Sequence, residues 1–569
     1  MAASGWAVLA ALFTQPVWMR MTAWGIHDWP QFYAWSEIPR RTLLVYRQFP
    51  LWDPYLMGGG MEIGHPHAAF LSPWFLPVLA WGPVVGLKLV AVSFVWLGFW
   101  GMWRLARSLA YHPAGAGLAA LLWGMNGWFA LSLATGHVDH LPLLLLPWVV
   151  RAMWQGCPMG AGAWWALMYL AGGPYPCCLT GIFLLLLAAC RSACERSLAP
   201  GVSWIRAALW TIGFSAVKLL PTVDFMTQWE PIPADAPGAT WWIVARSLLD
   251  RQLPLVAEYH EQLGSWEYGA YVGMIPVLLA LASLPARPSW ARGLTGAGLM
   301  ALLLAWGGPS RWWPYPLVFH HLPLLESFHV PFRFISVVVF TICLLSGLTL
   351  TRWAGTSLRR APWLWLLVLG IGLDLLVVNG RHLGQAAVTP PIVVEAAGPF
   401  RQQRLGFLGS PRPQDPEVLL QEPYAAAMYE NLLRGQGAVD TYDAVHLPIR
   451  ARAVGDPDYR GEVFLAGGAG RAALRRFTPN RLTLEVDAAQ PNLVVVNQNA
   501  ARGWWVVRVG RVAPARAWHG LIAAPVPPGR QTVTFVYLPL SALLGAAVTI
   551  ITILFAGRRW VRRRQIASA

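Results

Sequence analysis

The fold class is decided by residues 333–351, whose sequence is RFISVVVFTICLLSGLTLT. Between Arg333 and the Arg352 that follows, this stretch holds no charged residue, and most of its side chains are apolar. A bilayer core about 30 Å thick is crossed by roughly 20 consecutive apolar residues in a helix. The stretch therefore predicts a membrane-spanning helix bounded by arginines.

Similar segments recur along the whole chain. Hydrophobic residues make up 56% of the 569 positions and charged residues 12%, about half of the roughly 25% typical of soluble proteins. This composition excludes a single soluble enzyme, a disordered protein, a disulfide-stabilised mini-protein and a coiled coil. We expect a polytopic α-helical membrane protein with about 12 transmembrane helices. The expected spans are 5–24, 84–106, 114–134, 140–155, 160–172, 176–195, 204–221, 268–286, 293–307, 333–351, 361–378 and 536–556.

Basic residues set the expected orientation. The chain has a net charge of +16, and an arginine-rich tail follows the last span directly. Because cytoplasmic loops carry an excess of Lys and Arg, both termini are expected in the cytoplasm. Four further basic clusters then fall on the same side: Arg104/Arg107, Arg191/Arg196, Arg287/Arg292 and Arg352/Arg359/Arg360. The positive charge is thereby assigned to membrane loops, and no nucleic-acid partner is expected.

The same count defines three regions of the chain. Residues 1–379 form a transmembrane module with a long first outer loop, 25–83. Residues 380–535 form an extracytoplasmic, mixed and β-rich domain, and 536–569 form the last transmembrane helix and the basic cytoplasmic tail. The β-rich domain is expected to hold a helix near 414–435. Its expected strands are rich in β-branched residues: Arg481–Asp487, Asn492–Asn497 and Gln531–Tyr537.

The first outer loop contains the strongest candidate for acid–base chemistry. Asp28 lies a few residues beyond the expected first span, where partial burial would raise its pKa and make it a credible general base. The alternative is a helix N-cap, since Asp28 stands two residues before Pro30. Gln31 follows one turn later and is a candidate substrate contact.

Two more positions of this loop are ambiguous. Asp53 precedes a proline and a glycine run, which indicates a turn, although glycines also allow a backbone to approach a ligand closely. His65 and His67 could bind a metal together with Glu62 or Asp53, but their spacing is not specific for a metal site, and the common role of His as a plain polar group is favoured.

Ionisable residues also gather at two later membrane edges. His137, Asp139 and His140 lie in the connection between two expected spans, where such groups are functional candidates but where any loop is polar. Further on, Glu267, His329 and Arg333 stand near the starts of spans. Arg333 could extend to the interface or pair with a phosphate. No nucleotide-binding fingerprint, serine-nucleophile elbow or His-Glu-x-x-His motif is present.

Several short motifs occur in an order that resembles a known family. They are Asp28-x-x-Gln31, Pro50-Leu-Trp52-Asp53-Pro54-Tyr55-x-x-Gly58-Gly59, Trp266-Glu267-Tyr268, Phe328-His329-Val330-Pro331-Phe332-Arg333, Arg502-Gly503-Trp504-Trp505 and Pro528-Gly529-Arg530. With the layout of spans, they resemble the YfhO-like bacterial membrane proteins of the GT-C superfamily of polytopic glycosyltransferases. Asp53 departs from the pattern, because the family usually has Asn there.

The resemblance implies a function as well as a fold. It implies a GT-C-like module in the bacterial inner membrane that moves a sugar from a polyprenyl-phosphate-linked donor to a glycan, lipid or protein acceptor outside. Asp28 matches the superfamily's catalytic carboxylate. Taken together, the motifs and the ionisable clusters give these candidate substrate contacts: Gln31, Asp53, His65, His137, Asp139, His140, Glu267, His329 and Arg333. No cofactor is certain, and a divalent metal remains an open alternative.

A second hypothesis keeps the fold but not the chemistry. In it the protein is a non-catalytic membrane scaffold, or a partner subunit in a larger membrane complex. A third hypothesis, a lipid or glycan transporter, finds little support, because few charges fall near the middle of the expected spans.

Overall fold

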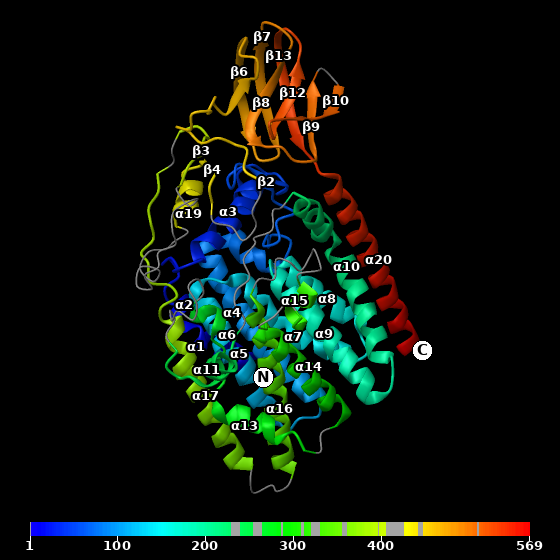
Figure 1. Ribbon diagram of the computed structural model, residues 1–569. Helices are drawn as coiled ribbons and strands as arrows, with labels where there is room; N and C mark the ends of the chain where they lie inside the picture. Colours follow the sequence, from blue (N-terminus) through cyan, green and yellow to red (C-terminus); the bar gives the residue numbers. More distant parts are fainter. Residues whose placement is uncertain are drawn as a thin grey trace. The chain divides into compact units, whose positions relative to one another are not determined.

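The computed structural model describes residues 2–228, 239–253, 264–285, 288–308, 312–319, 330–355, 361–395, 398–405, 426–441, 448–508 and 511–568. The chain divides into two compact units (Figure 1). Unit 1 comprises Met1–Trp29, Val84–Phe214 and Ile232–Thr389, and unit 2 comprises Pro30–Pro83, Ser215–Pro231 and Pro390–Ala569. Most of the first outer loop thus belongs to the same unit as the C-terminal region.

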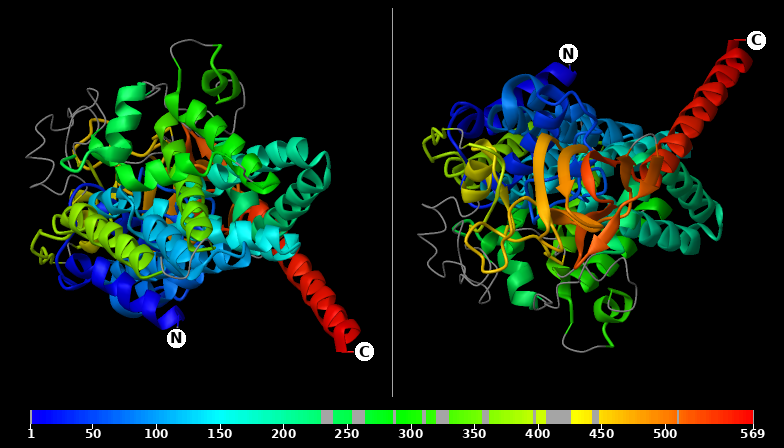
Figure 2. Two further views of the ribbon diagram at one scale, coloured as in Figure 1. Left: turned by 90° about the horizontal axis from the view of Figure 1, so that it is seen from below. Right: turned by 90° about the horizontal axis from the view of Figure 1, so that it is seen from above.

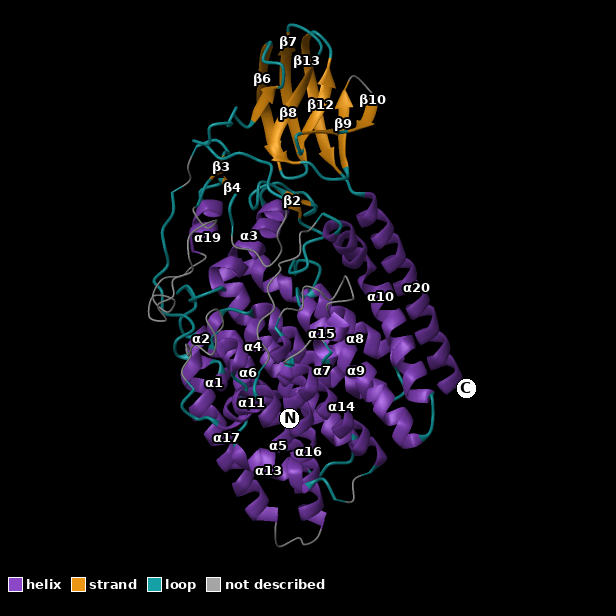
Figure 3. Ribbon diagram, viewed as in Figure 1, coloured by secondary structure: helices purple, strands orange, loops and turns teal. Residues whose placement is uncertain are grey.

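The named elements within the described part of unit 1 are helices joined by loops (Figure 3), with one isolated β-bridge between Trp24 and Thr389. Its helices are α1 (Ala2–Phe13), α2 (Gln15–Trp18), α4 (Leu76–Ser108), α5 (Pro113–Met125), α6 (Gly127–Thr135), η2 (Val138–Leu145), α7 (Leu146–Trp154), α8 (Pro158–Leu170), α9 (Pro174–Glu195), α10 (Ala199–Met226), α11 (Trp241–Leu249), α12 (Ser265–Tyr268), α13 (Met274–Ala282), α14 (Ser289–Trp306), α15 (Pro314–Phe319), η3 (Pro331–Phe334), α16 (Ile335–Gly355) and α17 (Ala361–Leu383). The first part of α4 and the last part of α10 extend into unit 2.

Six helical segments of the described residues are long and apolar enough to cross a membrane. They are Pro73–Ser108, Pro113–Thr135, Pro174–Glu195, Pro331–Gly355, Pro362–Leu383 and Leu540–Arg562. The chain is therefore a helical membrane protein. The other expected spans coincide with shorter or less apolar helices, so the count of about 12 stays a prediction.

Helix α16, which contains the stretch quoted first, is almost wholly enclosed in apolar packing: every residue from Ile335 to Leu350 is buried. It packs closely on α5 because glycines face each other. A Cβ atom on Gly115 would collide with the carbonyl oxygen of Gly347, and one on Gly347 would collide with that of Gly115. Small residues allow two membrane helices to approach in this way.

The segment around Gly172-Gly173-Pro174 resolves into two separate helices. Helix α8 ends at Leu170, Gly172 has a positive φ of 81°, and α9 begins at Pro174. A proline at the first helical position is favourable, because its missing N–H has no partner there.

Unit 2 contains a two-layer β-sandwich. One sheet has the order β10-β9-β13-β7-β6 and the other β11-β12-β8-β5, all antiparallel. The strands are β5 (Val463–Leu465), β6 (Gly470–Thr478), β7 (Arg481–Ala488), β8 (Asn492–Asn499), β9 (Trp504–Arg508), β10 (Arg511–Pro514), β11 (Arg516–Trp518), β12 (Leu521–Val526) and β13 (Gly529–Tyr537). The three strands expected from the sequence are β7, β8 and β13.

Alternation of side chains explains how the layers close. In β7, Leu482, Leu484 and Val486 are buried while their neighbours are more exposed, as expected when successive side chains point to opposite faces. They share one core with Val494 of β8 and Phe535 of β13. A β-rich region before the last helix is thus confirmed.

The rest of unit 2 consists of short elements and helices. Helix α3 (Trp29–Leu44) begins at Trp29, the last residue of the first segment of unit 1. The other elements are β1 (Trp52–Asp53), β2 (Gly60–Met61), η1 (Pro73–Phe75), β3 (Gln402–Gln403), α19 (Ala426–Leu433), β4 (Gly437–Ala438) and α20 (Leu540–Ser568). Helix α20, drawn in red and ending at the C-terminus in Figure 2, contacts the last part of α10, where the backbone N–H of Val217 donates to the hydroxyl of Thr549 at 2.9 Å.

Candidate functional site

Asp28 is held at the start of α3 by the end of α6. Its backbone N–H donates to the carbonyl of Thr135 at 3.0 Å, and the indole of Trp29 donates to the carbonyl of Leu133 at 3.1 Å. Helix α6 ends at Thr135, and Gly136 follows in the left-handed conformation with φ of 88°, a common helix C-terminus. Two chain segments about a hundred residues apart are thereby joined.

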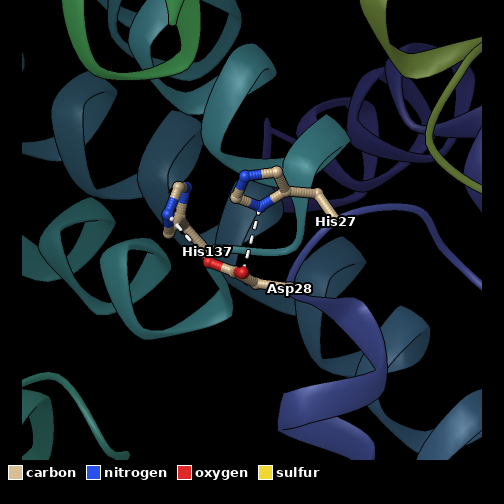
Figure 4. Close-up of side chains that lie close together, drawn as sticks. All are labelled: His27, Asp28 and His137. Atoms are coloured by element: carbon tan, nitrogen blue, oxygen red, sulfur yellow. Dashed lines mark ion pairs between the residues drawn. The ribbon is translucent and has the colours of Figure 1, made fainter. Parts of the chain in front are cut away.

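Two histidines point at the Asp28 carboxylate (Figure 4). His27 Nδ1 lies 3.0 Å from Oδ1 and His137 Nε2 lies 3.1 Å from Oδ2. The three side chains are buried, with exposed fractions of 8% for His27, 5% for Asp28 and 9% for His137. His27 has a φ of 53°, which is rare outside glycine; such strain is found preferentially at functional sites.

The histidines decide the ionisation of Asp28. Burial by itself would raise its pKa, but the charge of His27 and the hydrogen bonds from both rings outweigh burial and hold this pKa below its usual range. Burial also opposes protonation of His137, yet the hydrogen bond to Asp28 and its charge raise the pKa of that ring. The predicted rise of the Asp28 pKa is therefore wrong, because two imidazoles converge on it.

A second layer surrounds this trio. His140 stacks between Trp128 and His137, with ring centroids 5.0 Å apart on each side. Both histidines lie at i and i+3 around the 3-10 helix η2, where such positions eclipse. Ser132 Oγ lies 3.2 Å from His140 Nδ1, and Thr135 Oγ1 lies 3.1 Å from His137 Nδ1. Asp139, the remaining candidate of this connection, is also buried.

A buried ion pair lies in the same unit. The Arg333 guanidinium donates two hydrogen bonds to Glu267, at 2.9 and 2.5 Å, and lies over the ring of Tyr175, 4.2 Å from its centroid. Although burial raises the pKa of Glu267, the Arg333 charge and hydrogen bonds lower it to about 2. The ring of Trp266, next in sequence, lies 4.8 Å from that of His27, which connects the pair to the trio.

The sequence-based candidates therefore separate into groups. One group lies in unit 1, where the contacts described above connect its members: Asp28, His137, His140, Glu267 and Arg333. Gln31, Asp53 and His65 belong to unit 2, where each is buried. His329 lies outside the described residues.

In unit 2 the turn interpretation of Asp53 is confirmed, since its Oδ1 accepts the backbone N–H of Tyr55 at 2.7 Å. His65 lies in an aromatic cluster, with its ring centroid 5.0 Å from Trp35 and 5.8 Å from both Phe225 and His67.

The sequence analysis missed His27, Tyr175 and Trp266 as site residues. His27 adjoins Asp28, which is the one local signal that could have identified it. Tyr175 follows the Gly172-Gly173-Pro174 break, and nothing local marks it as a partner of Arg333.

One three-donor group that could hold a metal ion occurs among the described residues. It comprises His27, Asp28 and His137, whose ligand atoms all lie within 4.8 Å of one another. Two imidazoles and one carboxylate suit Zn²⁺ and related transition metals, whereas Mg²⁺ and Ca²⁺ prefer oxygen ligands alone. The residues present therefore fit a transition-metal ion. The described residues show no such group around His65 and His67, where a metal was the less favoured alternative.

Comparisons with known proteins give structural neighbours only. No protein-family model matches the chain, and no curated protein matches its sequence. The mycobacterial arabinofuranosyltransferase AftD is similar at 15% identity and a TM-score of 0.43, over 67% of this chain and 27% of that chain. ArnT from Cupriavidus metallidurans in the apo state is similar at 13% identity and a TM-score of 0.43, over 76% of this chain and 85% of that chain.

The chain thus spans about a quarter of the length of AftD, 27%. The YfhO-like resemblance, which no family model matches, stays a prediction.

Proposed function

We propose that this protein is a membrane glycosyltransferase that moves a sugar from a polyprenyl-phosphate-linked donor to an acceptor on the extracytoplasmic face. The observation that carries the proposal is a buried, ionised carboxylate, Asp28, between two histidines at a helix start. Charged groups at a membrane edge are expensive to bury and mark functional sites. The ordered GT-C-like motifs and the helical membrane architecture support the same conclusion.

Asp28 would act as the general base. The acceptor oxygen forms a bond to the anomeric carbon while the bond from that carbon to the phosphate oxygen breaks. The lipid phosphate leaves with the bonding electrons, and the acceptor proton passes to the Asp28 carboxylate. Because a carboxylate of low pKa is a weak base, the proton moves late, when bond formation has made the hydroxyl acidic.

The leaving phosphate requires positive charge nearby. His137 can supply it, because its raised pKa favours the protonated ring beside Asp28. Arg333 is less available, since Glu267 occupies its guanidinium on two sides. If a transition metal is bound by His27, Asp28 and His137, it would add Lewis-acid charge stabilisation.

The remaining candidates are proposed substrate contacts. Gln31, Asp53, His65, Asp139, His140 and His329 would contact the donor or the glycan, lipid or protein acceptor. Membrane lipids surround the protein.

Replacement of the carboxylate tests the proposal. Asp28→Asn keeps the side-chain shape and should lower transfer from a polyprenyl-phosphate sugar at least 100-fold, within the range for loss of a general base. Abundance in the membrane should stay unchanged. Asp250→Asn is the matched control, because Asp250 is partly exposed at the end of α11, where it pairs with Arg246 and accepts the backbone N–H of Gln252.

Two results would count against the proposal. Full activity of Asp28→Asn would remove the base assignment. Absence of any transfer by the wild type, together with copurification in a stable large complex, would favour the scaffold hypothesis instead.

A further inference from the structure

Unit 2 contains a hollow of about 140 Å³ that none of the chemistry above uses. Its lining includes Trp52, Gly59 and Gly60 from the first outer loop, Phe225 and Gln228 at the end of α10, and Arg450 before β5. All of these residues belong to unit 2. A cavity of about 150 Å³ accommodates one benzene-sized ring, so this hollow matches a single six-membered ring.

The floor of the hollow is aromatic and rigid. Trp52 is fully buried, its ring packs on Trp504 at 5.2 Å, and its indole N–H donates to Gln498 Oε1 at 2.8 Å. Phe225 is buried beside it in the same core. Other atoms cover both rings, so they keep the base of the hollow rigid and leave contact with an occupant to the more exposed lining.

One asparagine builds the polar wall. The side-chain amide of Asn499 donates to the carbonyls of Met57 and Gly59, at 2.7 and 3.0 Å. Its oxygen accepts the backbone N–H of Arg450 at 2.8 Å. Asn499 therefore holds the glycine loop and the backbone of Arg450 on opposite sides of one amide, as a site assembled from distant segments requires.

The glycines leave space beside the Trp52 ring because they have no side chain. Gly58 and Gly59 have positive φ values of 72° and 102°, and a Cβ on Gly59 would come within 3.0 Å of the Trp52 ring. A larger residue would fill the space beside the indole. The glycine run thus serves close approach as well as the turn.

The positive charge of Arg450 indicates which kind of ligand the hollow binds. Arg450 is exposed, and within the described part of the chain its guanidinium has no carboxylate partner. The side chain of Gln228 likewise has no hydrogen-bond partner among described residues, and it offers both a donor and an acceptor. Arginine binds carboxylates with two parallel hydrogen bonds.

We propose that this hollow binds one sugar residue that carries a carboxylate, a uronic acid of the acceptor glycan. The assignment of that residue to an acceptor rests on the proposed function. The sugar ring occupies the hollow, its hydroxyl groups meet the side chain of Gln228, and its carboxylate pairs with Arg450.

Ligand-observed NMR on the full-length protein in detergent tests the binding directly. Methyl glucuronoside should give saturable signals and bind at least tenfold more tightly than methyl glucoside. Arg450→Ala should remove that preference. Arg452→Ala, an exposed arginine two residues away that does not line the hollow, should retain it. Ala501→Phe, which fills the hollow from its lining, should abolish both signals.

Equal binding of the two glycosides would overturn the inference, as would equal effects of Arg450→Ala and Arg452→Ala. Inorganic phosphate that competes as well as glucuronate would identify a plain anion site and also overturn it. No donor is present in this experiment, so its result is independent of transfer. Transfer without glucuronoside binding would refute the acidic-sugar site alone, and binding without transfer would refute the glycosyltransferase alone.

Discussion

At the scale of single residues, buried charges in this protein are met by specific partners. Lys88 donates to the backbone carbonyls of Met21 and Ala23, at 2.9 and 2.6 Å, and also to that of Arg20. Lys218 donates in the same way to the carbonyls of Pro66 and Ala68. Each lysine fastens a loop of its own unit to a helix. These charges therefore have a structural explanation, and they do not indicate a path for ions.

The Glu267–Arg333 pair gives a prediction about stability. Glu267→Gln leaves the Arg333 guanidinium buried without its counter-charge, which typically costs about 3–5 kcal/mol. Thermal unfolding in detergent should show a large decrease in Tm. Glu195→Gln removes a partly exposed pair with Arg191 and should cost at most about 1 kcal/mol. Equal decreases in the two variants would contradict this role for the buried pair.

The same pair predicts a pH dependence. The pKa of Glu267 is lowered from 4.5 to about 2 by the Arg333 charge, against burial, which raises it. Its contribution to stability is therefore complete above pH 4.5 and declines as the pH falls from 4.5 toward 2. The difference in Tm between wild type and Glu267→Gln should shrink as the pH falls below 5; above pH 5 it also reports protonation of His137, whose charge interacts with Glu267. Using this difference cancels the contribution of Asp28, and a gap that stays constant at pH 3 would contradict the prediction.

At the scale of elements, Gly136 determines how the end of α6 meets the start of α3. It combines a φ of 88° with close approach, because a Cβ there would collide with the backbone nitrogen of Trp29. Gly136→Ala should destabilise the protein by more than the roughly 1–2 kcal/mol of left-handed backbone strain. Gly156 is a matched control, since it has a φ of 65° but open space around its Cβ position.

Comparing the two variants separates the cost of the left-handed backbone conformation from the cost of the collision with Trp29. Gly156→Ala should show the backbone cost alone, and Gly136→Ala should show that cost plus a collision and a loss of transfer activity, because Asp28 would shift. Chemical or thermal unfolding of both, with activity measured in parallel, checks the difference. Equal losses would mean that the α6–α3 contact is not decisive.

Local sequence patterns predict individual helices and strands better than they predict which distant side chains come into contact. Strands β7, β8 and β13 follow from local alternation and β-branched content, and the separation of α8 from α9 follows from Gly172-Gly173-Pro174. The sequence predicts Asp28 and His137 as separate candidates, because each lies at the edge of an expected membrane span. Their contact, and the resulting fall in the Asp28 pKa, depends on the α6–α3 junction, which no local pattern encodes. The contact between Tyr175 and Arg333 likewise depends on tertiary packing that no local pattern predicts.

At the scale of the whole molecule, charge asymmetry predicts how the chain lies in the membrane. The protein carries 43 Lys and Arg against 27 Asp and Glu, and the arginine clusters fall at the ends of helices that the positive-inside rule places in the cytoplasm. The β-sandwich of unit 2 would then be extracytoplasmic. The same rule places Cys194, an exposed native thiol between Arg191 and Arg196, inside the cell.

Thiol labelling in intact cells tests this orientation. A membrane-impermeant maleimide should leave Cys194 unmodified until the membrane is opened. In a Cys194→Ser background, Arg471→Cys on exposed strand β6 should react in intact cells, whereas Arg559→Cys in the basic C-terminal part of α20 should not. The result matters for the chemistry, because transfer on the outer face requires the sandwich and the Asp28 edge to be accessible there. Labelling of Arg559→Cys before Arg471→Cys would invert the topology and, with it, the side on which an acceptor could be met.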